Sequence, residues 1–269
     1  MKSLCLSLMR FLQTNIFSIL VLGMISGSVS ADSKNMAELY REAIEKWNYV
    51  LQNYVDELGR VDFHGIAKNP EELKSVVDVI AKYGPNSHPQ DFDTTNKVMA
   101  YHINTYNALA MQGVIDRGIP KGFTNTFKRA SFFLLRDVFI AGEKTNLYHY
   151  ENKVIRPLDE PRSHFALNCM VKDCPRLPQK AFTAENLDAE LDLATREFFS
   201  KPLHLRVDHD KQRIFVSSIL KFYTEDFVAS GKKKDLPQYI DGYLPEPLPE
   251  YKVHYIKYDW RINIQPHDS

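Results

Sequence analysis

The chain of 269 residues lacks a net charge, with 34 basic and 34 acidic side chains, and it lacks any long run of one sign. The short Lys232-Lys233-Lys234 cluster is typical of a solvated loop. Phosphate binding needs a clustered basic face, so the sequence argues against nucleic acid as a partner. The chain also lacks internal repeats and low-complexity stretches, and 12% of its residues are aromatic, which indicates an ordered globular protein.

A long apolar run is missing as well. Phe11–Ile25 is mostly apolar, but a membrane-spanning helix needs about 20 such residues. Lys2 and Arg10 precede this run and small residues follow it up to Ala31, which predicts a signal peptide over 1–31 and a periplasmic or secreted protein. An uncleaved membrane anchor is the alternative. Cys5 precedes the apolar run, which argues against a lipid-modified cysteine.

Cleavage would remove two basic residues and no acidic one, so residues 32–269 carry 32 basic and 34 acidic side chains, a formal charge of −2. We expect these residues to form one globular domain with no membrane span, because their number suffices for one sizeable core. No glycine-rich phosphate loop and no serine-nucleophile elbow is present. We expect neither a cofactor nor a bound metal.

A buried central helix is predicted over residues 95–117. Its apolar residues cover nearly the whole circumference, which is typical of a helix at the centre of a core. Asn104 and Asn107 nevertheless share one of its faces. A buried amide without partners costs about 1 to 3 kcal/mol, so both side chains should bind specific groups.

The other segments predict a mainly helical α+β fold with a small antiparallel sheet. Residues 121–136 read as irregular. The predicted helices are 36–58, ended by Gly59, one opened by Pro70, 146–155, 183–199 and 219–227. The predicted strands are 138–140, followed by a tight turn, a hairpin of 205–207 with 213–216, and 253–258.

Residues 161–176 concentrate the groups that could do chemistry, namely His164, Asn168, Cys169 and Cys174. In an oxidising compartment two remaining cysteines are more often a disulfide than free thiols. A disulfide across four intervening residues would stabilise at the low end of about 2 to 4 kcal/mol and would fix the shape of the loop 170–173. Redox chemistry and zinc binding fit this spacing and ligand count less well.

A thiol nucleophile is the sharper hypothesis. Cys169 would attack, His164 would act as base, and Asn168 would orient the histidine or donate to an oxyanion. Whether 163–169 is a strand or a helix, however, His164 reaches Asn168 more easily than Cys169. A buried histidine bonded to a backbone carbonyl is the structural alternative.

A second polar cluster is Asn104, Tyr106 and Asn107, with Glu151, Arg156 and Asp259. It forms either a pocket wall facing His164 and Cys169 or a buried network that docks one segment on another.

Several motifs, in order, resemble the domain-of-unknown-function 547 family across about residues 36–265. They are Ala100–Ala108, His164–Cys169, Cys174-Pro175, Ala184–Leu187, Lys221–Tyr223 with Asp226-Phe227, and Tyr258–Trp260 with Asn263. The resemblance implies an exported bacterial protein and indicates which residues cluster, but it implies no activity. His102 and Phe222 stand where the family usually has tryptophan, so His102 should be a core residue.

Two functions remain open. The first is a hydrolase or acyl-transferase acting on an amide or ester, with His164 as base and either Cys169 or an activated water as nucleophile. Neutral donors around one histidine suit such substrates better than phosphates. The second is a disulfide-braced binding or scaffold module without turnover, whose contact surface is formed by 170–173 and 121–136. The partner in either case is a small molecule or a peptide.

Overall fold

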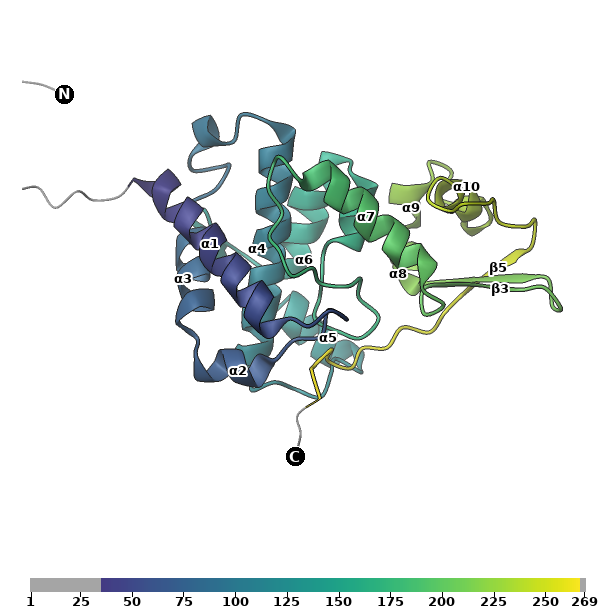
Figure 1. Cartoon of the computed structure of the whole chain (residues 1–269), viewed down its shortest axis with the longest axis horizontal. Helices are drawn as coiled ribbons and strands as arrows, with labels where there is room; N and C mark the ends of the chain where they lie inside the picture. Colours follow the sequence, from purple (N-terminus) through teal and green to yellow (C-terminus); the bar gives the residue numbers. More distant parts are fainter. Residues whose placement is uncertain (1–34, 267–269) are drawn as a thin grey trace, which may run out of the picture. The chain divides into compact units, whose positions relative to one another are not determined.

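The computed structural model describes residues 35–266 (Figure 1). The predicted signal peptide, its cleavage site and the domain boundary at residue 32 lie outside the described residues. The α-helices are α1 (Met36–Tyr54), α2 (Phe63–Lys68), α3 (Glu71–Ile80), α4 (Thr95–Asp116), α5 (Thr126–Phe133), α6 (Leu147–Tyr150), α7 (Leu187–Ser200), α8 (Ser218–Phe222), α9 (Thr224–Phe227) and α10 (Leu236–Asp241). The strands are β1 (Val138–Ile140), β2 (Glu143–Thr145), β3 (Leu205–Asp208), β4 (Arg213–Val216) and β5 (Lys252–Tyr255). Helices dominate, and the predicted α+β class is confirmed.

Helix α4 is the central helix that its apolar circumference predicts. Thr94 begins it by accepting a hydrogen bond from the Lys97 N–H, and α2, α3, α6 and α7 all contact it. Nearly every residue from Met99 to Val114 is buried. His102 is buried as well, and its Nδ1 lies 2.6 Å from the Tyr150 hydroxyl, so it is a core residue.

Helix α1 buries the predicted stripe, including Trp47 and Leu51, and packs on α3. It ends at Tyr54 rather than at residue 58, because Val55 turns into extended backbone and pairs with Val61. Gly59 (φ +74°) serves the turn between these two residues instead of ending the helix. A Cβ at this position would lie 2.7 Å from the Leu177 backbone nitrogen, so a larger residue would not fit.

Two small sheets complete the fold. β3 pairs antiparallel with β4, as predicted. β1 is the predicted strand at 138–140, and the turn after it leads into β2, an unpredicted strand that pairs antiparallel with β1. β5 pairs with β4 in parallel, so the second sheet is mixed. The parallel pairing was not predicted, because the sequence of one strand does not reveal the direction of its neighbour.

The prediction that 121–136 is irregular is wrong, because α5 lies within it. Asn125 caps this helix by accepting from the Lys128 N–H, and Phe132 is fully buried against Phe123 with ring centroids 4.2 Å apart. Phe127 on the same helix is 76% exposed. The many aromatic residues obscured the helical period, because they occupy both the buried and the exposed side.

The buried apolar side chains form two clusters that meet at the chemically rich segment. The first cluster contains side chains from each of the helices α1 through α6 and from part of the loop after residue 165. The second cluster contains side chains from the end of α7, from the three-stranded sheet and from the helices α8 through α10. Phe165 belongs to the second cluster and Ala166 to the first. Tyr258 packs against both. Within 35–266, no helix combines the length and the apolar character that a bilayer span requires.

Acid should destabilise this core through two buried histidines. Burial lowers the pKa of His102 to about 4, and burial together with Lys201 lowers that of His204 to about 3. Unfolded histidine takes up its proton near pH 6.5, so the unfolded chain binds more protons between about pH 6.5 and 4. The free energy of unfolding should therefore fall as pH falls through this window, by up to about 1.4 kcal/mol per pH unit and histidine.

Urea unfolding of the His204→Leu variant between pH 4.5 and 7.5 checks this. The free energy of unfolding of this variant should change less steeply with pH than that of the parent. The variant His209→Leu, at an exposed position, should keep the steepness of the parent. Equal slopes in all three proteins would contradict the assignment.

Candidate functional site

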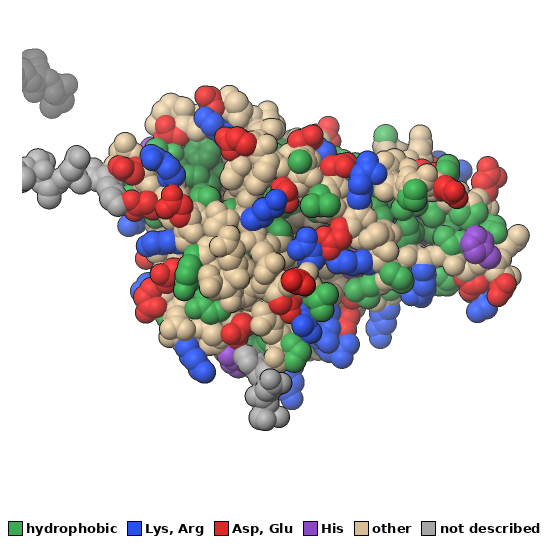
Figure 2. All heavy atoms as spheres, in the orientation of Figure 1, with side chains coloured by type: hydrophobic (Ala, Val, Ile, Leu, Met, Phe, Trp, Pro, Cys, Tyr) green, Lys and Arg blue, Asp and Glu red, His purple; other side chains and the backbone are tan. Residues whose placement is uncertain are grey.

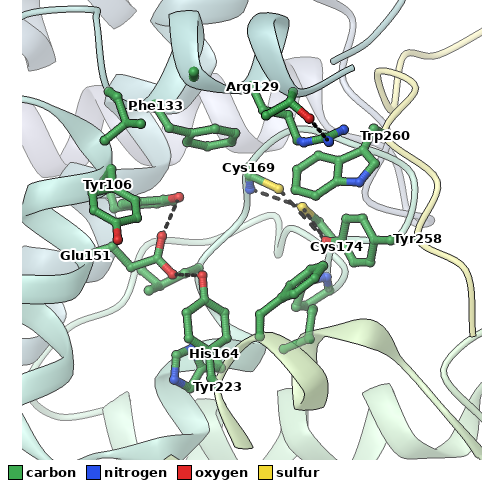
Figure 3. Close-up of a pocket in the computed structure, with 18 residues that line it drawn as sticks. Tyr106, Arg129, Phe133, Glu151, His164, Cys169, Cys174, Tyr223, Tyr258 and Trp260 are labelled. Carbon is green, nitrogen blue, oxygen red and sulfur yellow. Dashed lines mark hydrogen bonds between the residues drawn. The ribbon is translucent and has the colours of Figure 1, made fainter. Parts of the chain in front are cut away.

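A pocket of about 360 Å³ lies where the two clusters meet (Figure 3). It is lined largely by aromatic and aliphatic side chains. The charged or titratable lining residues that the structure describes, thiols and tyrosines apart, are Arg129, Glu151 and His164. The remaining lining residues are Tyr106, Thr126, Ala130, Phe133, Leu134, Tyr148, Leu167, Cys169, Cys174, Pro175, Ile219, Phe222, Tyr223, Tyr258 and Trp260.

The asparagines of α4 fix the segment that supplies the thiols. The Asn107 side chain donates from Nδ2 to the Ala166 carbonyl at 3.0 Å and accepts at Oδ1 from the Asn168 N–H at 2.7 Å. One turn away, Asn104 makes the same pair of bonds to the backbone of Phe182, at 2.7 and 3.0 Å. The predicted need of both amides for specific partners is confirmed, and neither asparagine lines the pocket.

Asn168 shapes the loop between the two cysteines. Its Nδ2 donates to the Pro175 carbonyl at 2.7 Å, and its Oδ1 accepts from the Met170 N–H at 2.7 Å. These bonds close the loop and hold Met170 in left-handed backbone (φ +65°), which is strained for a residue with a side chain. Both amide atoms are thus used inside the loop. Three of its residues, Met170, Val171 and Asp173, are buried.

Cys169 and Cys174 are both free thiols in this structure, and their predicted disulfide stays a prediction. The Cys174 Sγ accepts from the Cys169 N–H at 3.1 Å and from the Tyr258 hydroxyl at 3.5 Å (Figure 3). Burial alone would raise the pKa of Cys174, but hydrogen bonds from the Cys169 thiol, Tyr258 and the backbone outweigh it and lower the pKa. The same bond to Cys174, together with burial, raises the pKa of Cys169 well above its usual value. Ionisation of the pair is therefore favoured at Cys174 over Cys169.

Glu151 is the buried carboxyl group of the pocket, with 8% of its surface exposed. It lies at the start of the π-helical turn Glu151–Ile155 that continues α6. The Tyr106 hydroxyl donates to its Oε2 at 3.0 Å, and the Tyr223 hydroxyl donates to its Oε1. Both tyrosines have a pKa well above the usual value, first through burial and then through the charge of Glu151. Both therefore stay protonated as donors.

His164 faces a carboxylate rather than a thiol. Its Nε2 lies 2.7 Å from Asp226 Oδ2, and its ring stacks on Tyr223 with centroids 4.2 Å apart. Arg156 bonds the same carboxylate through Nε at 2.6 Å and Nη2 at 2.7 Å. Burial would raise the pKa of Asp226, but the bonds from His164 and Arg156 hold it well below its usual range. Figure 3 shows His164 beneath Tyr223, away from the two cysteines, and within 35–266 no hydrogen bond joins it to either thiol.

The predicted site residues therefore fall into two groups. Tyr106, Glu151, His164, Cys169 and Cys174 line one pocket. The others lie around it: Asn104, Asn107 and Asn168 hold the backbone, Arg156 supports Asp226, and Asp259 pairs with the exposed Arg261.

Sequence reasoning missed several functional candidates. Tyr223 lies between α8 and α9, and Asp226 lies in α9. Tyr258 and Trp260 come from the C-terminal segment. Their signal was present, because all four lie in stretches that resemble the family. Arg129, whose guanidinium lies over the Trp260 ring at 4.9 Å, lies in the segment 121–136, which was predicted as a contact surface without any single residue being named.

Comparison with known families shows a match over part of the chain. The model of a family described as a protein of unknown function, DUF547, matches residues 89–199. This match supports the DUF547 family. The matched region includes α4, Glu151, His164 and both cysteines, whereas Tyr223, Asp226 and Tyr258 lie beyond it. No curated protein and no solved structure matches the chain.

Removing the Asn107 amide should destabilise the fold and loosen the thiol loop. The Asn107→Ala variant leaves the Ala166 carbonyl and the Asn168 N–H buried without partners, so unfolding free energy should fall by at least about 2 kcal/mol. Urea unfolding measures this loss. Asn53→Ala, on the exposed side of α1, is the matched control and should change stability by less than about 1 kcal/mol. Equal losses in the two variants would refute the role of Asn107.

Proposed function

We propose that the pocket is the active site of a thiol-dependent hydrolase or acyl-transferase that acts on esters or amides, with Cys174 as the nucleophile. The observation that carries the proposal is the hydrogen-bonding of the Cys174 sulfur. It lines the pocket and accepts from a backbone N–H and a tyrosine hydroxyl, which favours the thiolate. The thiolate is the reactive form of cysteine.

The reaction would proceed in two steps that return every group to its starting state. The Cys174 thiolate attacks the carbonyl carbon, a C–S bond forms, and the C–O or C–N bond to the leaving group breaks. The leaving group takes a proton from Cys169 or Tyr258, which lie against the nucleophile. Water or an acceptor alcohol or amine then attacks the thioester, returns that proton, and releases the Cys174 thiolate with the acid, ester or amide product.

The proposal changes the roles that sequence reasoning gave to His164, Cys169 and Asn168. In the proposed mechanism Cys169 is a proton donor, and Asn168 shapes the loop. His164 is a positioning residue, because its stacking on Tyr223 and its bond to Asp226 hold the hydroxyl that bonds Glu151. The assignment made from the sequence has Cys169 as nucleophile and His164 as base. It predicts that Cys169→Ala loses more activity than Cys174→Ala, which is the opposite of the present proposal.

The pH dependence of alkylation tests the thiolate directly. Cys174 should react with iodoacetamide at a pH below that needed by Cys169, because its folded pKa is lowered and that of Cys169 is raised. Cys169→Ala and Tyr258→Phe each remove a donor and should raise the alkylation midpoint of Cys174, whereas Cys169→Ser keeps a donor and should shift it less.

Intact mass and peptide mapping report which thiol has reacted. A Cys169–Cys174 disulfide would be revealed by the loss of two hydrogens before reduction, and it would leave no thiolate until reduced. An alkylation midpoint of Cys174 at or above that of Cys169 would contradict the proposal.

Turnover separates the candidate functions. Reduced parent protein should hydrolyse some members of a panel of p-nitrophenyl esters and anilides, and Cys174→Ala should lose on the order of 100-fold or more in kcat/KM. Cys169→Ala should lose less. The reverse ranking would make Cys169 the nucleophile. An inactive parent across the panel would favour the second candidate, a binding module without turnover, for which the same preformed pocket is the supporting observation.

A further inference from the structure

We infer that the pocket recognises a protonated amine through Glu151, so that the ligand is an apolar molecule carrying an ammonium group. As far as this ligand is a substrate, the inference rests on the proposed function, because it names the class of substrate that the same pocket would take. The binding it describes does not require the thiol to react.

Glu151 is built to accept more hydrogen bonds than it receives. Each of its oxygens accepts one hydroxyl, from Tyr106 or from Tyr223, whereas a carboxylate can accept about four bonds in all. Among residues 35–266, no lysine, arginine or histidine forms an ion pair with it. Arg156, five positions along the chain, is bound to Asp226 and Glu225 instead.

A buried carboxylate of this kind lacks its counter-ion. Burying an ionised group is costly unless a partner of opposite charge accompanies it. The two tyrosine hydroxyls offset part of that cost, and an ammonium group entering from the pocket would supply both the missing charge and the missing donors. The aromatic lining favours the same ligand, because ring faces attract cations and also pack against an apolar body.

The position of Glu151 sets how such a ligand would lie. In Figure 3 the two cysteines lie between Glu151 and the Arg129–Trp260 pair. A ligand anchored at Glu151 by its amine would therefore extend across the thiols toward the aromatic side of the pocket. Arg129 is held at that side by its bond to the Phe123 carbonyl at 3.1 Å. A carboxylate-bearing ligand would meet Glu151 unfavourably, which makes the preference for an amine testable.

Three probes of equal length test the inference on the intact, reduced protein. Hexylammonium, 1-hexanol and hexanoate are unbranched six-carbon molecules with different head groups, and titration calorimetry measures the affinity of each. Hexylammonium should bind the parent protein at least about 10-fold more tightly than hexanol, and hexanoate should bind most weakly. Equal affinities, or tighter binding of hexanoate, would overturn the inference without any variant being needed.

Glu151→Gln removes the charge while keeping the shape of the side chain. Its affinity for hexylammonium should fall about 10-fold or more and its affinity for hexanol should not fall. Glu225→Gln is the matched control, because Glu225 is 77% exposed and does not line the pocket. Unchanged amine affinity in folded Glu151→Gln, with its fold checked by circular dichroism, would refute the role of Glu151.

The same titration on Cys174→Ala separates this inference from the proposed reaction. If Cys174→Ala keeps its amine affinity while no protein shows turnover, the thiol chemistry is wrong and the amine site stands. If turnover depends on Cys174 but the amine does not bind preferentially, the reaction stands and the substrate class is wrong.

Discussion

The pocket depends on one buried contact, the pair of hydrogen bonds between the Asn107 side chain and the backbone at Ala166 and Asn168. The backbone N–H and C=O groups of an irregular segment have no partners in regular secondary structure. When they are buried, a side-chain amide from a rigid helix can supply the missing hydrogen bonds. Helix α4 can do so because it is apolar on nearly all sides and therefore fixed at the centre of the core. The hydrogen bonds of Asn107 therefore fix the position of the loop that carries the two cysteines.

The anchored loop in turn organises the C-terminal segment. The Lys172 N–H donates to the Arg261 carbonyl, and the Asn263 N–H donates to the Met170 carbonyl. These bonds lay residues 258–263 along the loop and place the Tyr258 hydroxyl against Cys174. A residue near the end of the chain thus donates a hydrogen bond to a thiol 84 positions earlier.

Sequence reasoning was limited by how far apart along the chain the contacting residues lie. The period of α4 and its two asparagines are local features, and they predicted both the central helix and the packing of the cysteine segment against it. The pairs Glu151 with Tyr223 and His164 with Asp226 are separated by 72 and 62 positions, so no local period encodes them. Proximity in sequence suggested His164 with Cys169, but the four residues between them turn the histidine toward Tyr223.

Charge connects the two chemical features of the pocket. The bond to Cys174 and burial are the main causes of the raised pKa of Cys169, and the charge of Glu151 adds to them. An unpaired carboxylate therefore opposes negative charge on Cys169. An ammonium group bound at Glu151 would cancel this repulsion and lower the pKa of Cys169. In the proposed mechanism Cys169 gives a proton to the leaving group, so a cationic substrate would favour this proton transfer, and binding and chemistry would be coupled through one buried carboxylate.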